Sequence, residues 1–468
     1  MKVTELIDTL DNDEQIIDQQ FDGLLIWPTV RIVILQYFID KYNKLDNPRS
    51  VSNAYSLRQK LTGLIKAFGA CPFWGGKISL LIFNTSTSNI KDVNGKYFNR
   101  IVDYFFYHDS RDVRTIEDPI GFCHLTPRSH KTYSKLWLNI FSEVVARFDI
   151  FFSRKRSKAA YIEISNLLNW INRDMTKFEM QMDDEVIRKH LVKSILRMKP
   201  NYYLYKYLFK SKDINMLIIE DGYYGLEKAS LIRAAKDLKV KVVEPQHGFI
   251  NQNHPAYNYG SKISCNDFYK KYMPDTLFCY GQFWANSISV PNEKYILGNP
   301  HLEESLKKLK AVDLLKQILV LGSGVTVDET KALLNSLLEI KSPLYNVVYR
   351  PHPQEFEDVF LRYGELISKG VKLDLGNLYE SIAQSEIILG ELTTTIFEAI
   401  ALKKRVYLYD SSYTRTYFNS QIKYFKVFSL ANIRIIFENY SVDDEAVNYY
   451  WRKGWEESYR NFIKKNKA

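Results

Sequence analysis

The feature that most constrains the fold of this chain is a regular alternation of short apolar runs and helical patterns between residues 317 and 409. The apolar runs are rich in β-branched and aromatic residues; they lie at 317–321, 345–350, 371–374, 386–390 and 405–409. Strands that alternate with helices predict a parallel sheet covered by helices, because each crossover returns the chain to the same edge. We therefore predict a doubly wound, Rossmann-like α/β domain in this part of the chain.

A second, less regular series of the same kind precedes it. Its apolar runs lie at 77–87, 214–222, 240–248, 275–281 and 294–298. A chain of 468 residues exceeds one typical domain, so we predict two Rossmann-like domains that face each other across a cleft. We place them at 1–290, with helical insertions that include 129–148 and 157–198, and at 291–435. A basic, aromatic helix within 436–468 is expected to pack back on the first domain.

Composition bounds the class of protein. Hydrophobic content of 46% and charged content of 25% are ordinary for a globular protein. Four scattered cysteines without C-x-x-C spacing argue against a disulfide framework and fit a reducing compartment. The start of the chain carries no signal-peptide pattern, so we expect a cytoplasmic protein.

The net charge of +10 comes partly from short basic clusters, such as the one at 154–158, which has aromatic neighbours. Two interpretations stay open for these clusters. One is ordinary solvated surface; the other is peripheral contact with an anionic membrane, at the inner face of the cytoplasmic membrane. Nucleic acid is not an expected partner, because no zinc finger, aromatic RNA-binding motif or long basic stripe occurs.

Polar motifs follow several strands of the second domain, where ligands bind in open parallel sheets. A rigid R-P-H-P loop follows one predicted strand, and three threonines open the helix after another, where free backbone N–H groups favour an anion. N-capping alone explains one threonine and not three. The candidate nucleotide-binding residues are Gly322, Ser323, Gly324, Arg350, His352, Pro353, Thr393, Thr394, Thr395 and Glu398.

The G-S-G turn lacks the third glycine of the dinucleotide fingerprint and is interpreted as one wall of the nucleotide site. His352 is expected to bond phosphate oxygens and Glu398 to accept ribose hydroxyls. The alternatives are purely structural roles. The R-P-H-P loop could be a structural turn, and Glu398 could be an acidic residue that the helix dipole favours near the start of a helix.

Two further motifs end strands of the first domain. Glu220-Asp221-Gly222 brings two adjacent carboxylates, of which one can act as general base when their pKa values separate. Gln246-His247-Gly248 brings a histidine that can act as base or bind an anion. Helix capping and a backbone-bonded histidine are the structural alternatives. No metal-ligand motif occurs, so no metal cofactor is expected.

At these motifs the chain resembles bacterial GT-B glycosyltransferases that build capsule and lipopolysaccharide glycans. Glu220-Asp221-Gly222, His352-Pro353 and Thr393-Thr394-Thr395 are similar, in order and setting, to three motifs of bacterial sialyltransferases. The Gln-His-Gly and Arg-Pro-His-Pro motifs are similar to those of capsule Kdo transferases and CDP-glycerol transferases. The resemblance covers about residues 214–410 and consists of motifs of only a few residues each.

The resemblance implies an α/β GT-B fold and a metal-independent glycosyltransferase. The donor would be a CMP-linked nonulosonic or ulosonic acid, and the acceptor a surface glycan or glycolipid. Asp221 would be the base, His352 and the threonines would hold the phosphate or the donor carboxylate, and Glu398 would hold the ribose. Asp221 and His247 both stay open as the base. A transferase using an NDP-sugar or CDP-glycerol, a nucleotide-sugar epimerase or hydrolase, and a non-enzymatic glycan-binding protein are the alternatives.

Overall fold

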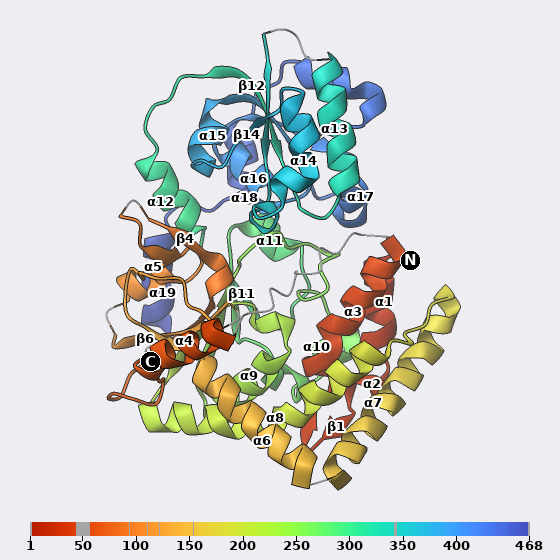
Figure 1. Ribbon diagram of the computed structural model, residues 1–468, viewed down its shortest axis with the longest axis vertical. Helices are drawn as coiled ribbons and strands as arrows, with labels where there is room; N and C mark the ends of the chain where they lie inside the picture. Colours follow the sequence, from red (N-terminus) through yellow and green to blue (C-terminus); the bar gives the residue numbers. More distant parts are fainter. Residues whose placement is uncertain are drawn as a thin grey trace.

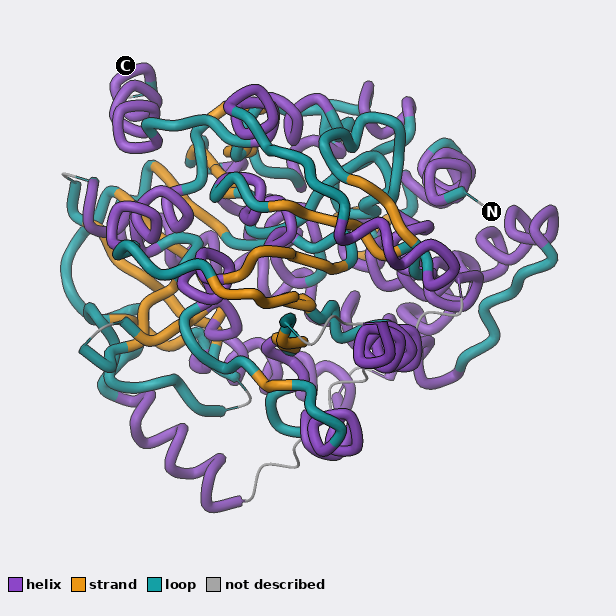
Figure 2. The backbone as a smooth tube through the Cα atoms, turned by 90° about the horizontal axis from the view of Figure 1, so that it is seen from above, coloured by secondary structure: helices purple, strands orange, loops and turns teal. Residues whose placement is uncertain are grey.

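A computed structural model of the protein describes residues 2–43, 57–92, 94–109, 111–120, 122–152, 154–340 and 344–466. Its two main sheets define two domains, one above the other in Figure 1. Seen from above in Figure 2, the strands run through the interior and helices surround them. The predicted fold class, an α/β GT-B architecture of two Rossmann-like domains facing each other, is confirmed by these two sheets.

The first domain is built on a seven-stranded sheet in which every neighbouring pair is parallel. Its central strands read as unbroken apolar runs because helices cover both of their faces. In spatial order the strands are β11 (Glu293–Ile296), β10 (Thr276–Cys279), β9 (Lys241–Pro245), β8 (Met216–Ile219), β3 (Leu80–Thr85), β6 (Val113–Asp118) and β7 (Thr132–Ser134).

The second domain is built on a six-stranded parallel sheet. In spatial order its strands are β14 (Lys372–Leu373), β13 (Asn346–Arg350), β12 (Leu315–Leu321), β15 (Ser385–Gly390), β16 (Arg405–Tyr409) and β17 (Lys426–Phe428). The strand order reverses at β12, and in such sheets ligands bind beside the carboxyl ends of the strands at this reversal. The G-S-G turn follows β12, so the predicted nucleotide motifs lie at the switch point.

Helices cover the two sheets and join them. Those of the first domain are α1 (Val3–Asp11), α2 (Glu14–Ile17), α3 (Trp27–Asn43), α4 (Leu57–Phe68), α5 (Asp103–His108), α6 (Leu136–Phe152), α7 (Arg154–Met175), α8 (Glu185–Lys212), α9 (Glu227–Asp237), α10 (Ser261–Cys265) and α11 (Gln282–Asn286). Those that follow are α12 (Pro300–Lys308), α13 (Val327–Ile340), α14 (Val359–Ser368), α15 (Leu378–Gln384), α16 (Thr394–Ala401), α17 (Ser412–Tyr417), α18 (Asp444–Tyr450) and α19 (Trp455–Lys465).

Two predicted helices differ in the structure. The span 129–148 contains the edge strand β7 before α6 begins. Its three residues pair with β6, a tertiary contact that a helical pattern cannot reveal. The C-terminal span is two helices, because the chain turns between Trp451 and Gly454, and Gly454 has a positive φ of 85°.

Helix α19 packs against the first sheet although it follows the second in sequence. The Phe462 ring lies 4.8 Å from that of Phe278 on β10, and Trp455 is fully buried beside α5. The Tyr295 hydroxyl donates a hydrogen bond of 2.8 Å to the Ser458 carbonyl. The division at 290 and 435 stays a prediction; the chain crosses between the two sheets twice, before β12 and after β17.

An aromatic cluster joins the two domains. Phe283 and Trp284 of α11 meet Phe397 of α16 and Tyr450 of α18, with ring centroids 4.7 to 6.2 Å apart. All four rings are buried and belong to one continuous core that includes side chains of both sheets. This buried apolar contact holds the two domains together.

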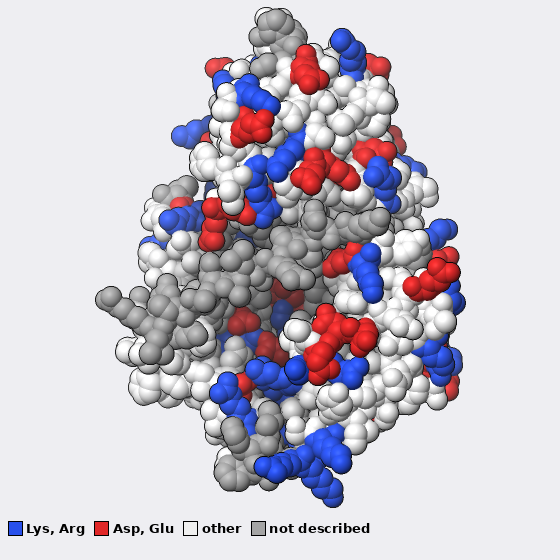
Figure 3. Space-filling view, turned by 45° about the vertical axis from the view of Figure 1, so that its right-hand side comes forward, with Lys and Arg blue, Asp and Glu red and all other residues white. Residues whose placement is uncertain are grey.

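The surface carries mixed charges on the face drawn in Figure 3, where basic and acidic side chains are interspersed and basic ones gather at the lower end. Within the described part of the chain, no helix has the length and apolar character needed to cross a membrane.

Candidate functional site

Two motifs of the first domain meet at the carboxyl ends of β8 and β9. Asp221 follows β8 in a left-handed conformation with φ of 57°, a backbone geometry that Asp tolerates better than most residues. Its Oδ1 lies 3.2 Å from Nδ1 of His247, which follows β9. The two side chains are 27% and 22% exposed, so both are accessible from solvent. The structure therefore brings the two candidate bases together as a dyad.

The groups around Asp221 keep its side chain negatively charged. Burial raises its pKa most strongly, but Lys228 and His247 outweigh that effect and lower the pKa below its usual value. The Lys228 ammonium lies 3.5 Å from Asp221 Oδ2 and also donates to the Glu220 carbonyl at 2.8 Å. Asp221 is thus an anion at neutral pH, suited to stabilise a cationic or N–H-donating imidazole.

The Tyr257 hydroxyl makes a second contact with the same nitrogen of His247. The Tyr257 hydroxyl lies 3.2 Å from His247 Nδ1 and donates a hydrogen bond of 2.6 Å to Glu244 Oε1. Glu244 is fully buried on β9, and its other oxygen accepts from the Tyr223 N–H at 2.7 Å. Burial raises the pKa of Glu244 to about 8. These groups fix the orientation of the imidazole ring.

Glu220, the third predicted catalytic residue, is buried, unlike the two residues of the dyad. It is only 2% exposed, and burial together with Asp221 raises its pKa. Its Oε2 accepts from the Thr85 N–H at 3.0 Å and from Asn99 Nδ2 at 3.2 Å, and Oε1 accepts from the Ser88 hydroxyl. Its carboxylate is therefore engaged in holding the segment from residue 85 to 99 against β8.

In the second domain the G-S-G turn packs against the loop that carries His352. A Cβ on Gly322 would lie 2.4 Å from the Tyr349 hydroxyl, so only glycine fits there. Gly324 has φ of 78°, a conformation that favours glycine, and a Cβ there would lie 3.4 Å from that of His352, so the turn and the loop are in contact. The turn thus forms a close wall beside the predicted phosphate-binding loop.

The turn is also tied to the loop after β15. Ser323 and Thr326 lie 3.3 Å apart through their hydroxyls, and Thr326 donates to Glu391 Oε1 at 2.6 Å. Burial raises the pKa of Glu391, against hydrogen bonds that lower it. These contacts hold the two loops of the switch point together.

Two polar atoms beside this contact have no hydrogen-bond partner among the described residues. They are Oε2 of Glu391 and Oγ1 of Thr393, both buried. Thr393 is the N-cap residue of α16 but makes no side-chain capping bond. An unpaired buried polar group costs about 1–3 kcal/mol, and native proteins keep few of them. Their position at the start of a helix makes them candidate groups for a polar ligand.

The R-P-H-P loop has two differently placed polar residues. Arg350 donates to Asp374 Oδ2 at 2.7 Å and to the Gly376 carbonyl at 3.0 Å, so its guanidinium bridges to the loop after β14. His352 is partly buried, and its backbone N–H donates to Glu355 Oε2 at 2.9 Å. Burial and the charge of Arg100 lower the pKa of His352 to about 4, so it is neutral at physiological pH. Pro353 is exposed and begins a short 3-10 turn.

Glu398 lies one turn into α16 and is only 3% exposed. Burial raises its pKa, and the charge of Arg100 opposes this rise. Tyr379 of α15 is nearby, and its buried hydroxyl has no hydrogen-bond partner of good geometry in the described chain. Carboxylate and phenol together offer acceptors and a donor to the hydroxyls of a ligand.

The two halves of the site meet directly. A Cβ placed on Gly248 would lie 3.6 Å from Oγ1 of Thr394, so the Q-H-G loop passes close to the first turn of α16. The next residue, Phe249, stacks on Phe397 with ring centroids 5.6 Å apart and an interplanar angle of 19°. The loop that carries His247 thus lies next to the threonine-rich helix start of the second domain.

The sequence predicted the positions of the motifs but not several of their partners. Glu244 is a charged residue inside an apolar run, a pattern that signals a buried functional or structural acid. Arg100, Tyr257 and Tyr379 belong to no motif, and only the fold places them here. Within the described ranges, no group of three or more His, Cys, Asp or Glu side chains has the arrangement of a metal site.

Comparisons with known proteins give distant structural matches. No family model and no curated protein sequence matches the chain. UDP-GlcNAc 2-epimerase from Methanocaldococcus jannaschii superposes with a TM-score of 0.46 at 12% identity, over 83% of this chain and 100% of its own. MurG from Acinetobacter baumannii gives 0.42 at 9%, over 83% and 99%. The lipopolysaccharide outer core galactosyltransferase WaaB gives 0.39 at 10%, over 83% and 99%. At this low identity and overlap we take neither substrate nor reaction from these proteins.

Proposed function

We propose that the protein is a glycosyltransferase that moves a sugar from a nucleotide donor onto a surface-glycan acceptor. The observation that carries this proposal is the Asp221–His247 dyad, because the loop that carries His247 passes close to the threonine-rich start of α16 in the other domain. A base on one side and an anion-binding helix start on the other are what glycosyl transfer from a nucleotide requires. The proposed donor is a CMP-linked nonulosonic or ulosonic acid, on the strength of the three sialyltransferase-like motifs.

In the proposed mechanism His247 is the base and Asp221 orients it. Nδ1 of His247 has two oxygen neighbours, Asp221 Oδ1 and the Tyr257 hydroxyl. Tyr257 directs its own proton to Glu244, so it presents a lone pair to the histidine. Nδ1 therefore carries the ring proton, and Nε2 is left as the lone pair that accepts a proton.

The acceptor hydroxyl would give its proton to His247 Nε2 as its oxygen bonds to the anomeric carbon. The nucleotide leaves with the electron pair of the broken glycosidic bond. Neutral His352, the N–H groups at the start of α16 and the Thr393 hydroxyl would stabilise the phosphate, and Glu398 would accept the ribose hydroxyls. No step requires a metal ion, and all residues named belong to this chain.

A thermal-shift screen against CMP, CDP, UDP, GDP and ADP tests the donor class. A ligand at 100 times its dissociation constant stabilises the folded state by about 2.7 kcal/mol. We expect CMP to give the largest shift. A larger shift with UDP would redirect the proposal to an NDP-sugar transferase, and one with CDP to a CDP-glycerol-type transferase. No shift with any nucleotide would favour a glycan-binding protein without catalytic activity.

A nucleotide-sugar epimerase or hydrolase remains the second candidate, because an acid–base dyad beside a nucleotide site serves either reaction. The two classes differ in their need for an acceptor. Incubation with donor alone should leave the donor nearly intact if the protein is a transferase. Rapid release of free nucleotide, or a new epimeric sugar without acceptor, would identify the alternative.

We further propose that α4 and α6 contact an anionic membrane, which would hold a glycolipid acceptor. Leu61, Ile65 and Phe68 of α4 and Phe141, Val144 and Phe148 of α6 are 51–74% exposed and form what we call the α4–α6 surface. The two helices touch, and Phe68 lies 5.7 Å from the Trp137 ring. Exposed Arg147 lies within this surface, and exposed Arg154 and Lys155 follow it at the start of α7. Apolar side chains with basic neighbours suit an anionic lipid surface.

A further inference from the structure

Arg100 is a cation of the first domain whose side chain has no partner in the part of the chain that the structure describes. Within the described residues its guanidinium makes no hydrogen bond and no ion pair, and only its backbone N–H is bonded, to the Ser88 carbonyl at 3.2 Å. The side chain lines a small pocket at the carboxyl ends of β9, β10 and β11, together with Gln246, Tyr280 and Asn299. A guanidinium carries five N–H donors, so one that is left unpaired beside a pocket is prepared for an anion.

The position of Arg100 is fixed by the residue before it. Asn99 ends the β4–β5 hairpin (Asn89–Lys91 and Tyr97–Asn99), and it is fully buried. Its side-chain amide donates to the Thr85 carbonyl at 3.1 Å and to Glu220, and its Oδ1 accepts from the N–H groups of Ile101 and Val102 at 2.9 and 3.1 Å. Arg100 is therefore anchored on both sides along the chain.

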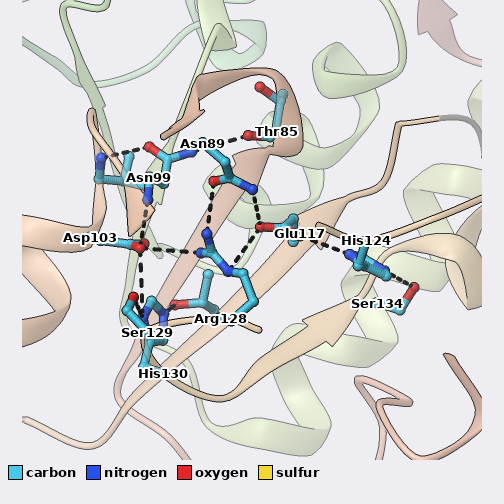
Figure 4. Close-up of polar contacts among 12 residues, drawn as sticks. Thr85, Asn89, Asn99, Asp103, Glu117, His124, Arg128, Ser129, His130 and Ser134 are labelled. Carbon is cyan, nitrogen blue, oxygen red and sulfur yellow. Dashed lines mark hydrogen bonds and ion pairs between the residues drawn. The ribbon is translucent and has the colours of Figure 1, made fainter. Parts of the chain in front are cut away.

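A buried network extends this anchor away from the site, as Figure 4 shows. Asp103 accepts from the Asn99 backbone N–H at 2.8 Å and from Arg128 at 3.2 Å. Arg128 also bonds Asn89 at 2.8 Å and lies 3.3 Å from Glu117, which pairs with His124 at 2.8 Å. So extensive a network holds the hairpin rigidly, which keeps the following guanidinium in one place.

The charge of Arg100 acts on side chains of the second domain and of the segment between the domains. Its positive charge lowers the pKa of His301 to about 3, with burial as the larger cause, and acts in the same way on His352. It also opposes the effect of burial on Glu398, yet Arg100 and Glu398 form no ion pair. His301 accepts or donates a 3.0 Å bond with Tyr104 of α5, and its ring lies 5.7 Å from that of Tyr379. Through His301, α5 of the first domain is thus linked to α15 of the second.

We propose that Arg100 binds the anionic group of the donor, supplied by the first domain and facing His352. The proposal rests on the proposed function, and the ligand chemistry is a phosphate or carboxylate that Arg100 holds through paired N–H bonds. Glu398 and the Tyr379 hydroxyl, on both of which the charge of Arg100 acts, suit the ribose diol next to such a phosphate. In this proposal Arg100 would hold the phosphate and Glu398 the ribose of the same nucleotide.

Calorimetric titration of the full chain with three probes tests this assignment. The probes are the nucleotide that gives the largest thermal shift, its nucleoside without phosphate, and a CMP-linked ulosonic acid. For R100Q we expect at least tenfold weaker nucleotide binding, unchanged nucleoside binding and an unchanged melting temperature without ligand. R100K should lie between R100Q and the wild type, because it keeps the charge but loses the paired bonds. R460Q, at an exposed position of α19, should match the wild type.

The outcomes distinguish a phosphate from a carboxylate as the anion that Arg100 binds. They also distinguish failure of the Arg100 proposal from failure of the proposed function. A loss of affinity for the nucleotide itself assigns Arg100 to the phosphate. A loss only for the intact sugar-acid donor assigns it to the carboxylate. If the wild type binds nucleotide and R100Q binds all three probes equally well, the Arg100 proposal is overturned while the proposed function stands. If the wild type binds no nucleotide, both are overturned.

Discussion

The Tyr257 hydroxyl lies 3.2 Å from Nδ1 of His247, the same atom that faces Asp221 at an equal distance. An imidazole nitrogen placed between two acceptors carries the proton, and the other nitrogen is then free to act as a base. The sequence left Asp221 and His247 as competing bases. Their contact is the basis of the proposed division of roles, in which Asp221 would position His247 as the base.

Replacement of either member of the dyad should slow sugar transfer without weakening the binding of the nucleotide. We expect D221N and H247Q each to lower kcat about 10²- to 10⁴-fold, the usual contribution of a positioned base. Nucleotide affinity in calorimetry should change less than about twofold, since a mutation at the base leaves the phosphate contacts intact. D267N, at a carboxylate that is 93% exposed, is the matched control. A D221N enzyme with wild-type turnover would contradict the role given to Asp221.

His352 should act as a neutral hydrogen-bonding group. Its pKa of about 4 leaves it uncharged between pH 6 and 8, so binding through it should not depend on protonation in that range. We expect the ratio of nucleotide affinities of wild type and H352Q to change less than about twofold between pH 6 and 8. A protonated His352 in the complex would instead make the wild type lose affinity relative to H352Q as pH rises, by up to about tenfold per unit.

Glu244 should make the folded state less stable at alkaline pH. Its pKa is raised from 4.5 to about 8, so the native state binds one more proton than the unfolded state within that window. The stabilising contribution is complete below pH 4.5, and it is lost as pH rises through 8. The difference in free energy of unfolding between wild type and E244Q should therefore fall steadily from pH 5 to pH 8.5. Denaturant unfolding at a series of pH values measures it, and a flat difference would show that Glu244 is already ionised.

Removal of the unpaired Thr393 hydroxyl should lower the nucleotide affinity without lowering the free energy of unfolding. In T393V the buried hydroxyl without a partner is removed, so the free energy of unfolding should stay equal or rise by up to about 1 kcal/mol. Nucleotide affinity should fall about three- to tenfold, the value of one lost hydrogen bond. T276V is the matched control, because the buried Thr276 hydroxyl donates to Glu293 at 2.8 Å. That variant should lose stability and keep its affinity; the same pattern in T393V would remove Thr393 from the site.

Five of the six strands of the second domain could be predicted to within two residues, whereas β17 was not predicted, and the strands of the first domain could be predicted only in part. Strand β16 spans 405–409 as predicted, because a strand buried on both faces leaves an uninterrupted apolar run. Strand β6 was not predicted, since it ends in Glu117 and Asp118 and contains Arg114. Those charges are tolerated because Glu117 meets His124 and Arg128 in the network of Figure 4, contacts that only the fold creates.

The candidate site, too, could be predicted only where its residues belong to motifs at strand ends. Motifs at strand ends predicted where Asp221, His247 and Thr393 would lie, because parallel strands bring their carboxyl ends to one edge. Nothing in the sequence set Arg100 apart, since it stands in a hairpin that carries no repeated pattern. Its place in the cleft depends on Asn99 and on Glu220, which sits more than a hundred residues further along the chain.

The α4–α6 surface should carry any attachment to membranes. Phe141 and Phe148 are 54% and 61% exposed on one face of α6, and burial of each ring is worth about 1.5–3 kcal/mol. The double change F141S/F148S should therefore weaken binding to vesicles with anionic lipid at least tenfold in co-sedimentation, with nucleotide affinity unchanged. F360S, at a 66% exposed position on α14, is the matched control. High salt should weaken the wild type as well, because the basic neighbours contribute through screened charges. Equal binding by the double variant and F360S would exclude the α4–α6 surface as the point of contact.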